Sequence, residues 1–252
     1  MPRVKTFLML LLLPAALLRG ATREEVLARV RSLRDATDYT ASGRLVSILP
    51  SGERTSHSIA FRAHAFPDGL RIWCEVEAAP SAGIRLLMFV PPQPPATIRT
   101  GHRGDRAPKE LSAKQWGEGL LATNFTYEDL LENYFLWRRQ TLLPEAKYGA
   151  RTCLVMRSEP GPTDQTHYSS VISWLDRDNY HAVKVEKVAR TSGEVKEFVY
   201  YGLRQVKGVW SASQIECKVK GKQGSSLLII NRGTEKPHLE RSAFDPALLV
   251  KP

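Results

Sequence analysis

The residues with the widest range of chemistry in this chain are its six histidines, and their spacing does not assemble them into a site. His57 and His64 share one predicted hairpin, yet no neighbouring Asp, Glu or Cys completes a metal-binding set around them. The chain also contains no His-Glu-x-x-His sequence, no Gly-x-Ser-x-Gly nucleophile turn and no glycine-rich phosphate loop. We therefore predict no catalytic residue, no metal ligand and no cofactor.

Two groups of carboxylates have a spacing that could do chemistry, and each has a simpler interpretation. Glu128 and Asp129 are adjacent, but neighbouring residues on a helix point in different directions and cannot act on one substrate bond. Carboxylates in a first helical turn are favoured by the helix dipole, so we expect this pair to stabilise a helix start. Asp176 and Asp178 resemble the beginning of a calcium loop without its closing glutamate, which favours a tight hairpin turn.

The three cysteines, Cys74, Cys153 and Cys217, are an odd number, and no pair of them has metal-ligand or redox spacing. One disulfide with one free thiol is compatible with an oxidising compartment. Three buried, reduced cysteines are equally compatible, because each lies within an apolar strand pattern. Both alternatives stay open at this point.

The first twenty residues predict an export signal. Arg3 and Lys5 precede an apolar run over residues 7–18, and the small residues Gly20 and Ala21 follow it. The run is too short to cross a bilayer comfortably, although an uncleaved membrane anchor is the alternative. We expect residues 1–20 to be removed and residues 21–252 to form a single domain, and export argues against nucleic acid as a partner. The formal net charge of +10 would then fall by three units, which is compatible with anionic lipid headgroups or with solubility alone.

Periodicity places these residues on one helix followed by many strands. Thr22 and Glu25 form a capping box, and Val26, Val30 and Leu33 follow at helical spacing, which predicts a helix over residues 22–35. After Tyr39 the apolar residues alternate, and turn signals recur about every ten residues, as in an antiparallel meander. We predict strands at residues 45–49, 59–63, 70–76, 84–90, 152–156, 170–175, 183–186, 195–201, 209–219 and 225–231.

A second helix is expected over residues 125–135. Thr126 would be its N-cap, Asp129 would occupy the third helical position, and Phe125 and Leu130 stand at the spacing of a hydrophobic staple. The apolar face would then continue through Leu131 and the aromatic residues that follow. A further helical turn is expected at Pro246, with Asp245 as its cap.

The segment Asn124-Phe125-Thr126-Tyr127-Glu128-Asp129-Leu130 resembles the Ser-Asp-Phe-Thr-Tyr-Glu-Asp-Leu signature of bacterial outer-membrane lipoprotein-sorting-like proteins, with Asn124 where the family usually has aspartate. These proteins are distant relatives of the periplasmic lipoprotein carrier LolA. The order downstream is also similar: Trp174-Leu175-Asp176 resembles a Trp-x-Asp hairpin, and residues 244–248 resemble a closing Phe-x-x-x-x-Leu. The resemblance covers roughly residues 111–249.

This resemblance implies a mainly β (α+β) fold of the LolA type. In that fold, one strongly curved antiparallel sheet forms an open, incomplete β-barrel, and helices cover its concave face around a hydrophobic cavity. It also implies a non-enzymatic, periplasmic carrier that shields the acyl chains of lipids or lipoproteins. An inner-membrane export complex or an outer-membrane acceptor would be its protein partners.

The residues that we expect to line such a cavity are large and apolar: Trp73, Leu87, Phe89, Leu131 and Phe135. The tryptophans of the strands could equally fill an ordinary core. Two other functions stay open beside the carrier. One is an envelope sensor or binding module of the same fold that binds a partner protein without transporting lipid. The other is a secreted hydrolase whose site the sequence does not show.

Overall fold

The computed structural model describes residues 20–78, 83–206, 209–235 and 237–252. The predicted export signal, except for Gly20, lies outside the described residues. The elements that position the rest of the chain are, in order, α1 (Arg23–Asp35), β1 (Asp38–Ile48), β2 (Arg54–Phe66), β3 (Gly69–Glu77), β4 (Ile84–Val90), β5 (Thr97–Gly101), β6 (Lys109–Glu110), the 3-10 turns η1 (Gln115–Gly117), η2 (Glu128–Leu130) and η3 (Tyr134–Leu136), β7 (Arg139–Tyr148), β8 (Arg151–Glu159), β9 (Tyr168–Asp176), β10 (Ala182–Ala189), β11 (Val195–Tyr201), β12 (Arg204–Val206), β13 (Val209–Ser211), β14 (Gln214–Val219), β15 (Ser225–Glu235) and the 3-10 turns η4 (Arg241–Phe244) and η5 (Pro246–Leu249).

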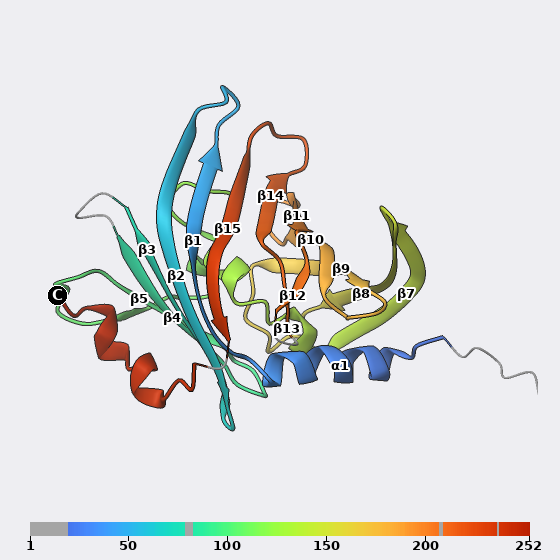
Figure 1. The fold of residues 1–252 in the computed structure, drawn as a ribbon, viewed down its shortest axis with the longest axis horizontal. Coiled ribbons are helices and arrows are strands. Elements are labelled where there is room, and N and C mark those ends of the chain that lie inside the picture. Colours follow the sequence, from blue (N-terminus) through green and yellow to red (C-terminus); the bar gives the residue numbers. More distant parts are fainter. Residues whose placement is uncertain (1–19, 79–82, 207–208, 236) are drawn as a thin grey trace, which may run out of the picture.

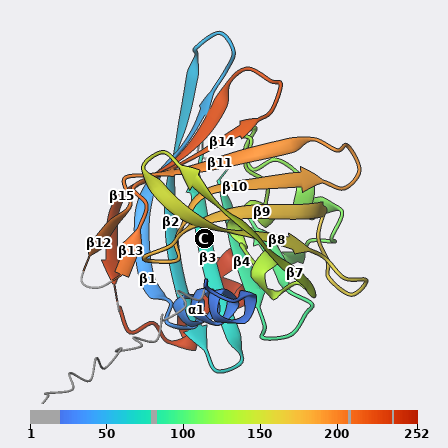
Figure 2. The same cartoon turned by 90° about the vertical axis from the view of Figure 1, so that its right-hand side faces the viewer.

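Within the described residues, thirteen strands form one antiparallel sheet in the order β6-β5-β4-β3-β2-β1-β15-β14-β11-β10-β9-β8-β7. The sheet is strongly curved, as Figures 1 and 2 show, and its two edge strands, β6 and β7, are not hydrogen-bonded to each other. The first and last strands, β1 and β15, pair in the middle and join the two halves of the chain. The expected mainly β fold with a large, curved and unclosed antiparallel sheet is therefore confirmed.

The junction between the two halves depends on a glycine. The register of β1 against β15 shifts between Ser42 and Gly43. A Cβ atom at Gly43 would lie 1.9 Å from the carbonyl oxygen of Ile229, so any side chain there would push β15 away. The close approach of the two central strands therefore requires a glycine at this position.

The concave side of the sheet contains the main apolar core. Even-numbered residues of β3 and β4, such as Cys74 and Leu86, pack into this core, while their odd-numbered neighbours face the convex side. Residues 111–137, which we name the inner segment, lie inside the curve of the sheet, and Trp116 and Leu120 of this segment are fully buried there. An irregular segment with three short 3-10 turns thus covers the concave face, rather than the helices that we expected.

The second predicted helix, over residues 125–135, is wrong. The chain there forms the separate turns η2 and η3, and Glu132 between them has a φ of +44°. Thr126 does not cap a helix; it bridges to Gly119, and its hydroxyl donates to Asp129 Oδ2 at 2.9 Å. The residues have helical spacing in the sequence, but the buried polar contacts of this segment with the sheet determine its backbone conformation.

Two helical elements lie outside the inner segment. The capping box of α1 is confirmed: Thr22 Oγ1 accepts from the Glu25 backbone N–H at 3.2 Å, and Glu25 Oε2 accepts from the Thr22 backbone N–H at 2.7 Å. The helix packs through Val26 and Leu27 on the β8–β9 end of the sheet, near its open edge. The expected cap of the final turn is also confirmed, because Asp245 Oδ1 accepts from the Ala247 backbone N–H at 2.9 Å.

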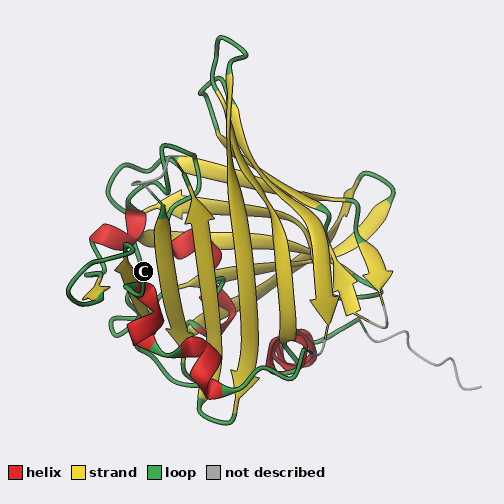
Figure 3. Ribbon diagram, turned by 60° about the vertical axis from the view of Figure 1, so that its left-hand side comes forward, coloured by secondary structure: helices red, strands yellow, loops and turns green. Residues whose placement is uncertain are grey.

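Residues 239–251, which we name the C-terminal segment, cross the convex side of the sheet, as Figure 3 shows. Phe244 and Leu249 of this segment pack on Trp73 and Leu87, so this part of the sheet is buried on both faces. Arg85 fastens the end of the segment by donating to the carbonyl oxygens of Leu248 and Lys251, at 3.0 and 2.5 Å.

Most of the predicted strands are present within longer ones, and two differences stand out. The predicted strand 209–219 is divided into β13 and β14 at residues 212–213, and β7 was not predicted at all. Pro144 in β7 coincides with a register shift between Leu143 and Ala146, which is where a proline is tolerated in an edge strand. In the described part of the chain, no helix combines the length and the apolar composition needed to cross a membrane.

Candidate functional site

From β5 across the sheet to β9, the concave face carries apolar side chains except for Lys187 and Lys196. Its border is only partly covered. Along this border the inward-facing side chains are half-buried and pack against the core: Ala41, Tyr200, Ile215 and Ile230 from the sheet, and Tyr127, Leu130, Phe135 and Leu136 from the inner segment. Half-buried apolar side chains of two facing layers provide surface on which an apolar ligand can be buried.

A buried ion cluster fixes the first half of the inner segment. The side chain of Asp129 is 0 % exposed, and its carboxylate accepts from Lys187 Nζ at 3.0 Å and from Lys196 Nζ at 3.4 Å. The Tyr168 hydroxyl donates to the same carboxylate at 2.5 Å, and the Thr126 backbone N–H donates at 2.8 Å. These partners come from β9, β10, β11 and the inner segment itself, so the cluster joins the segment to three strands.

The two lysines hold the Asp129 carboxyl in its ionised form. Burial alone would raise the pKa of Asp129, but Lys187 and Lys196, with the hydrogen bonds from Tyr168 and Thr126, hold that pKa well below its ordinary value. Lys187 Nζ also lies 4.6 Å from the centroid of the Phe198 ring, a cation–π contact that compensates part of its burial. The cluster is a structural anchor with no open approach for a substrate, because its charged side chains are at most 9 % exposed.

The other member of the carboxylate pair, Glu128, points to different partners. Its carboxylate accepts from the Thr166 hydroxyl, and it lies 2.6 Å from His167 Nδ1. The carboxylates of Glu128 and Asp129 therefore do not converge on a common point, as we expected from their adjacency. Both fasten the inner segment to the start of β9.

The second half of the inner segment is attached at the apolar border. The Tyr200 hydroxyl of β11 donates to Glu132 Oε1 at 2.7 Å. In the described residues no Lys, Arg or His forms an ion pair with Glu132. This hydrogen bond lies at the surface, whereas the ion pairs of Asp129 are buried. Packing of Leu131, Tyr134 and Trp137 in the core also holds this half of the segment.

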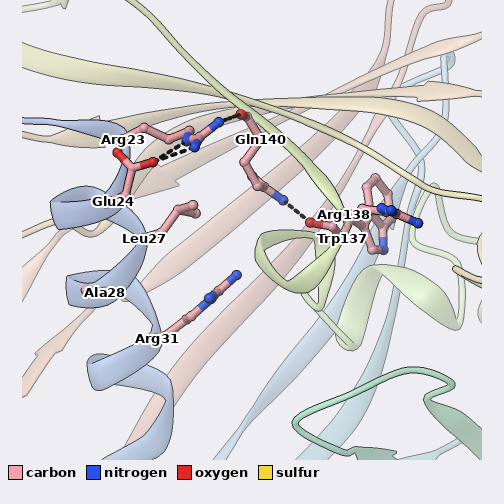
Figure 4. Close-up of a pocket in the computed structure, with 8 residues that line it drawn as sticks. All are labelled: Arg23, Glu24, Leu27, Ala28, Arg31, Trp137, Arg138 and Gln140. Atoms are coloured by element: carbon pink, nitrogen blue, oxygen red, sulfur yellow. Dashed lines mark hydrogen bonds and ion pairs between the residues drawn. The ribbon is translucent and has the colours of Figure 1, made fainter.

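A pocket of about 360 Å³ lies where α1 approaches the beginning of β7. Figure 4 shows its lining: Arg23, Glu24, Leu27, Ala28 and Arg31 from α1, and Trp137, Arg138 and Gln140 from the segment that faces α1. Gln140 fixes the backbone of this facing segment, since its Nε2 donates to the carbonyl oxygens of Tyr134 and Trp137 at 2.8 and 3.0 Å. The pocket therefore has one wall on a helix and one on the end of the inner segment.

The five residues that we expected to line one cavity lie on two faces of the sheet. Trp73 and Leu87 belong to the convex cluster under the C-terminal segment, and Phe89 lines a second pocket of about 210 Å³ on that face. Leu131 is buried in the concave core, and Phe135 is half-buried at its edge. The structure brings Leu131 and Phe135 together and separates them from the other three, so the five do not form one lining.

Except for Phe135, sequence reasoning missed the residues of the apolar border, and it missed the lysines of the ion cluster. Tyr200, Ile215 and Ile230 were within predicted strands, but their faces could not be assigned before the pairing was known. The positions of Lys187 and Lys196 could have indicated the cluster. Each stands at an inward position of an alternating strand, where burying a charge costs free energy unless the charge is paired.

Among the described residues, no group of three or more His, Cys, Asp or Glu side chains could hold a metal ion. Cys74, Cys153 and Cys217 are all free and buried, which decides between the two alternatives left open for them. No pair of cysteines forms a disulfide in the described chain.

Comparisons with known proteins agree on the fold. A family model described only as an uncharacterized protein matches residues 105–251. Among curated proteins, none matches this chain in sequence. Three solved structures have similar folds. A domain described as that of an outer membrane lipoprotein-sorting protein from Vibrio parahaemolyticus has a TM-score of 0.79 and 18% identity, over 90% of this chain and 99% of that one.

The other two structures are similar in extent. A DUF1329 family protein from Desulfovibrio piger has a TM-score of 0.79 and 14% identity, over 90% of this chain and 97% of that one. A LolA superfamily protein from Nitrosomonas europaea has a TM-score of 0.70 and 16% identity, over 91% of this chain and 100% of that one. The resemblance to lipoprotein-sorting-like proteins is therefore confirmed as a shared fold.

Proposed function

We propose that this chain is a periplasmic, non-enzymatic carrier of lipid or lipoprotein acyl chains. It belongs to the family of uncharacterized proteins whose model covers residues 105–251, and it has the fold of a lipoprotein-sorting domain. The acyl chain would lie on the concave face of the sheet. Its export would follow from the signal expected in residues 1–20, which N-terminal sequencing of the native protein tests: a mature chain beginning within two residues of Ala21 is the expected result.

The observation that carries this proposal is the half-buried apolar border of the concave face. Tyr200, Ile215 and Ile230 of the sheet and Leu130 and Leu136 of the inner segment all pack against the concave core and keep part of their apolar surface exposed. Exposed apolar surface is expected where a ligand or a partner covers it. A concave site bounded by two apolar layers suits a flexible chain of methylene groups, because each buried methylene contributes about 0.8 kcal/mol.

Release of the ligand also has a structural basis in this arrangement. The inner segment is fixed at Asp129 by buried charges, while its second half is attached to β11 through the exposed hydrogen bond from Tyr200 to Glu132. Only the exposed part at Glu132 would move away from the border, because Leu131, Tyr134 and Trp137 of the same half are buried in the core. No residue needs to make or break a covalent bond in such a cycle.

The test is binding of a fluorescent acyl chain on a neutral glycerol head. We expect the purified protein to bind this probe with micromolar or tighter affinity. Ile230→Glu should weaken binding at least tenfold, because a carboxylate would be placed against the acyl chain. Ile229→Glu is the matched control: it stands next in β15, is also half-buried, and faces the convex side.

Circular dichroism of both variants shows whether they are folded. Equal binding by the two folded variants would contradict an acyl site on the concave face. A folded wild-type protein that does not bind the probe at all would contradict the carrier function.

The alternative function is a binding module that recognises an envelope partner protein and transports nothing. One observation favours it: Trp116, Leu120 and Leu131 of the inner segment are at most 2 % exposed, so the segment fills the centre of the concave face. A stable complex with a membrane protein, isolated from cells without bound lipid, is the result that would favour this module over the carrier.

A further inference from the structure

The pocket between α1 and the end of the inner segment combines cations with an apolar floor. Arg23, Leu27 and Arg31 are four residues apart in α1 and therefore lie on one face of the helix. Leu27 is buried, as is Trp137 on the facing chain. Figure 4 shows Arg23 and Arg31 extending from the helix toward that facing chain. At about 360 Å³ the pocket is within the range of about 300–1,000 Å³ that small-molecule sites occupy.

The charge of this pocket is not compensated by its own residues. Arg23 is paired with Glu24, the one acid in the lining. Arg31 donates to the Phe135 carbonyl oxygen at 3.2 Å, and neither Arg31 nor Arg138 has a carboxylate within ion-pair distance among the described residues. Arg31 and Arg138 are thus two arginines of the lining without a carboxylate partner. Guanidinium groups bind phosphate and carboxylate groups through paired hydrogen bonds.

One side chain, Phe135, lies between the region of the pocket and the concave face. Phe135 packs both against the main core and against the apolar cluster under α1, and it is half-buried between them. Arg31 holds the backbone of the same residue. A ligand whose polar end lies at Arg31 can therefore pass its apolar part over Phe135 toward the border of the concave face.

We propose that this pocket binds the anionic, phosphate-bearing headgroup of the lipid whose acyl chain the concave face holds. The inference rests on the proposed carrier function and makes it more specific: the preferred ligand is an anionic phospholipid, not a neutral lipid. The acyl chain supplies most of the binding energy, and the arginines discriminate between headgroups.

Three probes separate the contributions: a monoacylglycerol, a lysophosphatidylglycerol with the same acyl chain, and glycerol phosphate without a chain. The variant is Arg31→Gln with Arg138→Gln. Its matched control is Arg29→Gln with Arg139→Gln, which removes the same charge from the same two chain segments at residues that do not line the pocket. Glutamine can still donate to the Phe135 carbonyl oxygen, so the fold should be preserved.

We expect the wild-type protein to bind lysophosphatidylglycerol more tightly than monoacylglycerol. The pocket variant should lose about five- to tenfold in affinity for lysophosphatidylglycerol and nothing for monoacylglycerol. The loss should shrink as ionic strength rises, because salt screens exposed charges. The control should bind both lipids like the wild type.

Two outcomes would overturn the headgroup site while leaving the carrier intact. One is equal affinity for both lipids with unchanged binding by the pocket variant. The other is glycerol phosphate binding as tightly as lysophosphatidylglycerol, which would make the pocket a small-anion site unconnected to the acyl chain. Failure of the carrier function is distinct, since monoacylglycerol would then not bind either.

Discussion

Replacing Asp129 by asparagine tests whether the buried ion cluster anchors the inner segment. The substitution keeps the size of the side chain and removes its charge, leaving Lys187 and Lys196 with side chains 3 % and 9 % exposed and no carboxylate. Removing one partner from a buried ion pair costs about 3–5 kcal/mol, because the remaining charge stays buried without compensation. The carboxamide can accept at one atom only, so part of the bonding from Tyr168 and Thr126 is lost too.

Chemical denaturation followed by circular dichroism measures this loss, with Asp35→Asn as the control. Asp35 forms an exposed ion pair with Arg34, and loss of such a pair costs about 1 kcal/mol or less. A free energy of unfolding reduced by less than about 1 kcal/mol in Asp129→Asn would refute the anchor. A second variant, with Lys187→Met and Lys196→Met added to Asp129→Leu, should recover much of the loss, because well-packed apolar residues can replace a buried ion cluster.

The same carboxylate predicts a dependence of stability on pH. The pKa of Asp129 is lower in the folded protein than in the unfolded chain, where an aspartate has a pKa of about 3.9. Its contribution is therefore complete above about pH 5 and is lost as the pH falls below about 4 toward the lowered pKa of the folded state. Unfolding free energies measured between pH 3 and 7 should show a smaller acid-induced loss in Asp129→Asn than in the wild type. Parallel curves for the two proteins would contradict the assignment.

Three further predictions concern the packing of the two faces. Leu131→Ala should cost roughly 2–5 kcal/mol of unfolding free energy, because the side chain is 2 % exposed in the concave core; a loss below 1 kcal/mol would show loose packing there. Phe89→Glu should leave binding of the neutral acyl probe within about twofold of wild type, because Phe89 is on the convex face, and abolished binding by a folded variant would place the site there instead. Burial raises the pKa of Cys74, Cys153 and Cys217, so the native protein should react slowly with thiol reagents at pH 8 and the unfolded protein should show three thiols; rapid labelling of the native protein would contradict their burial.

Local signals predicted the parts of this fold that depend on neighbouring residues. The capping box at Thr22 and Glu25 determines where α1 begins, and Asp245 before Pro246 determines the last turn. Turns such as Asp68-Gly69 mark hairpins because the positive φ of Gly69, +138°, is strained for other residues. Strand β7 escaped prediction because Pro144 interrupts its pattern and its edge position leaves many of its side chains exposed.

The wrong helix over residues 125–135 shows where local signals fail. Thr126, Asp129 and Leu130 have the spacing of a helix start, yet the carboxylate that would serve the helix dipole is drawn to lysines 58 and 67 residues away. Leaving the two lysines buried without this carboxylate would cost about 3–5 kcal/mol, whereas only a few tenths of a kcal/mol per residue separate helical from irregular backbone. Such partners are distant in sequence and become visible only when the strands are paired.

The sequence predicted an apolar site, but it did not show which face of the sheet carries most of the site's residues. The alternation of β3 and β4 was evident, but both of their faces are apolar because the C-terminal segment covers the convex one. Trp73, Leu87 and Phe89 therefore satisfied the same pattern as their concave neighbours. Choosing between the faces requires the position of residues 239–251, which no local pattern reveals.

The open edge between β6 and β7 has a mechanical consequence. A closed ring of strands can enlarge its interior only by breaking backbone hydrogen bonds or by sliding the register. In the described part of the sheet, the strands of the two halves pair only where β1 meets β15, so a small change in curvature along the sheet widens the interior while every ladder stays intact. The inner segment resists the widening, because the Asp129 cluster binds it to β10 and β11 and the Leu111 backbone N–H binds it to Ile98 of β5. The apolar packing of this segment and of α1 is non-directional and can re-form at a new spacing. In the proposed carrier, the width of the interior could therefore adjust to ligands of different thickness.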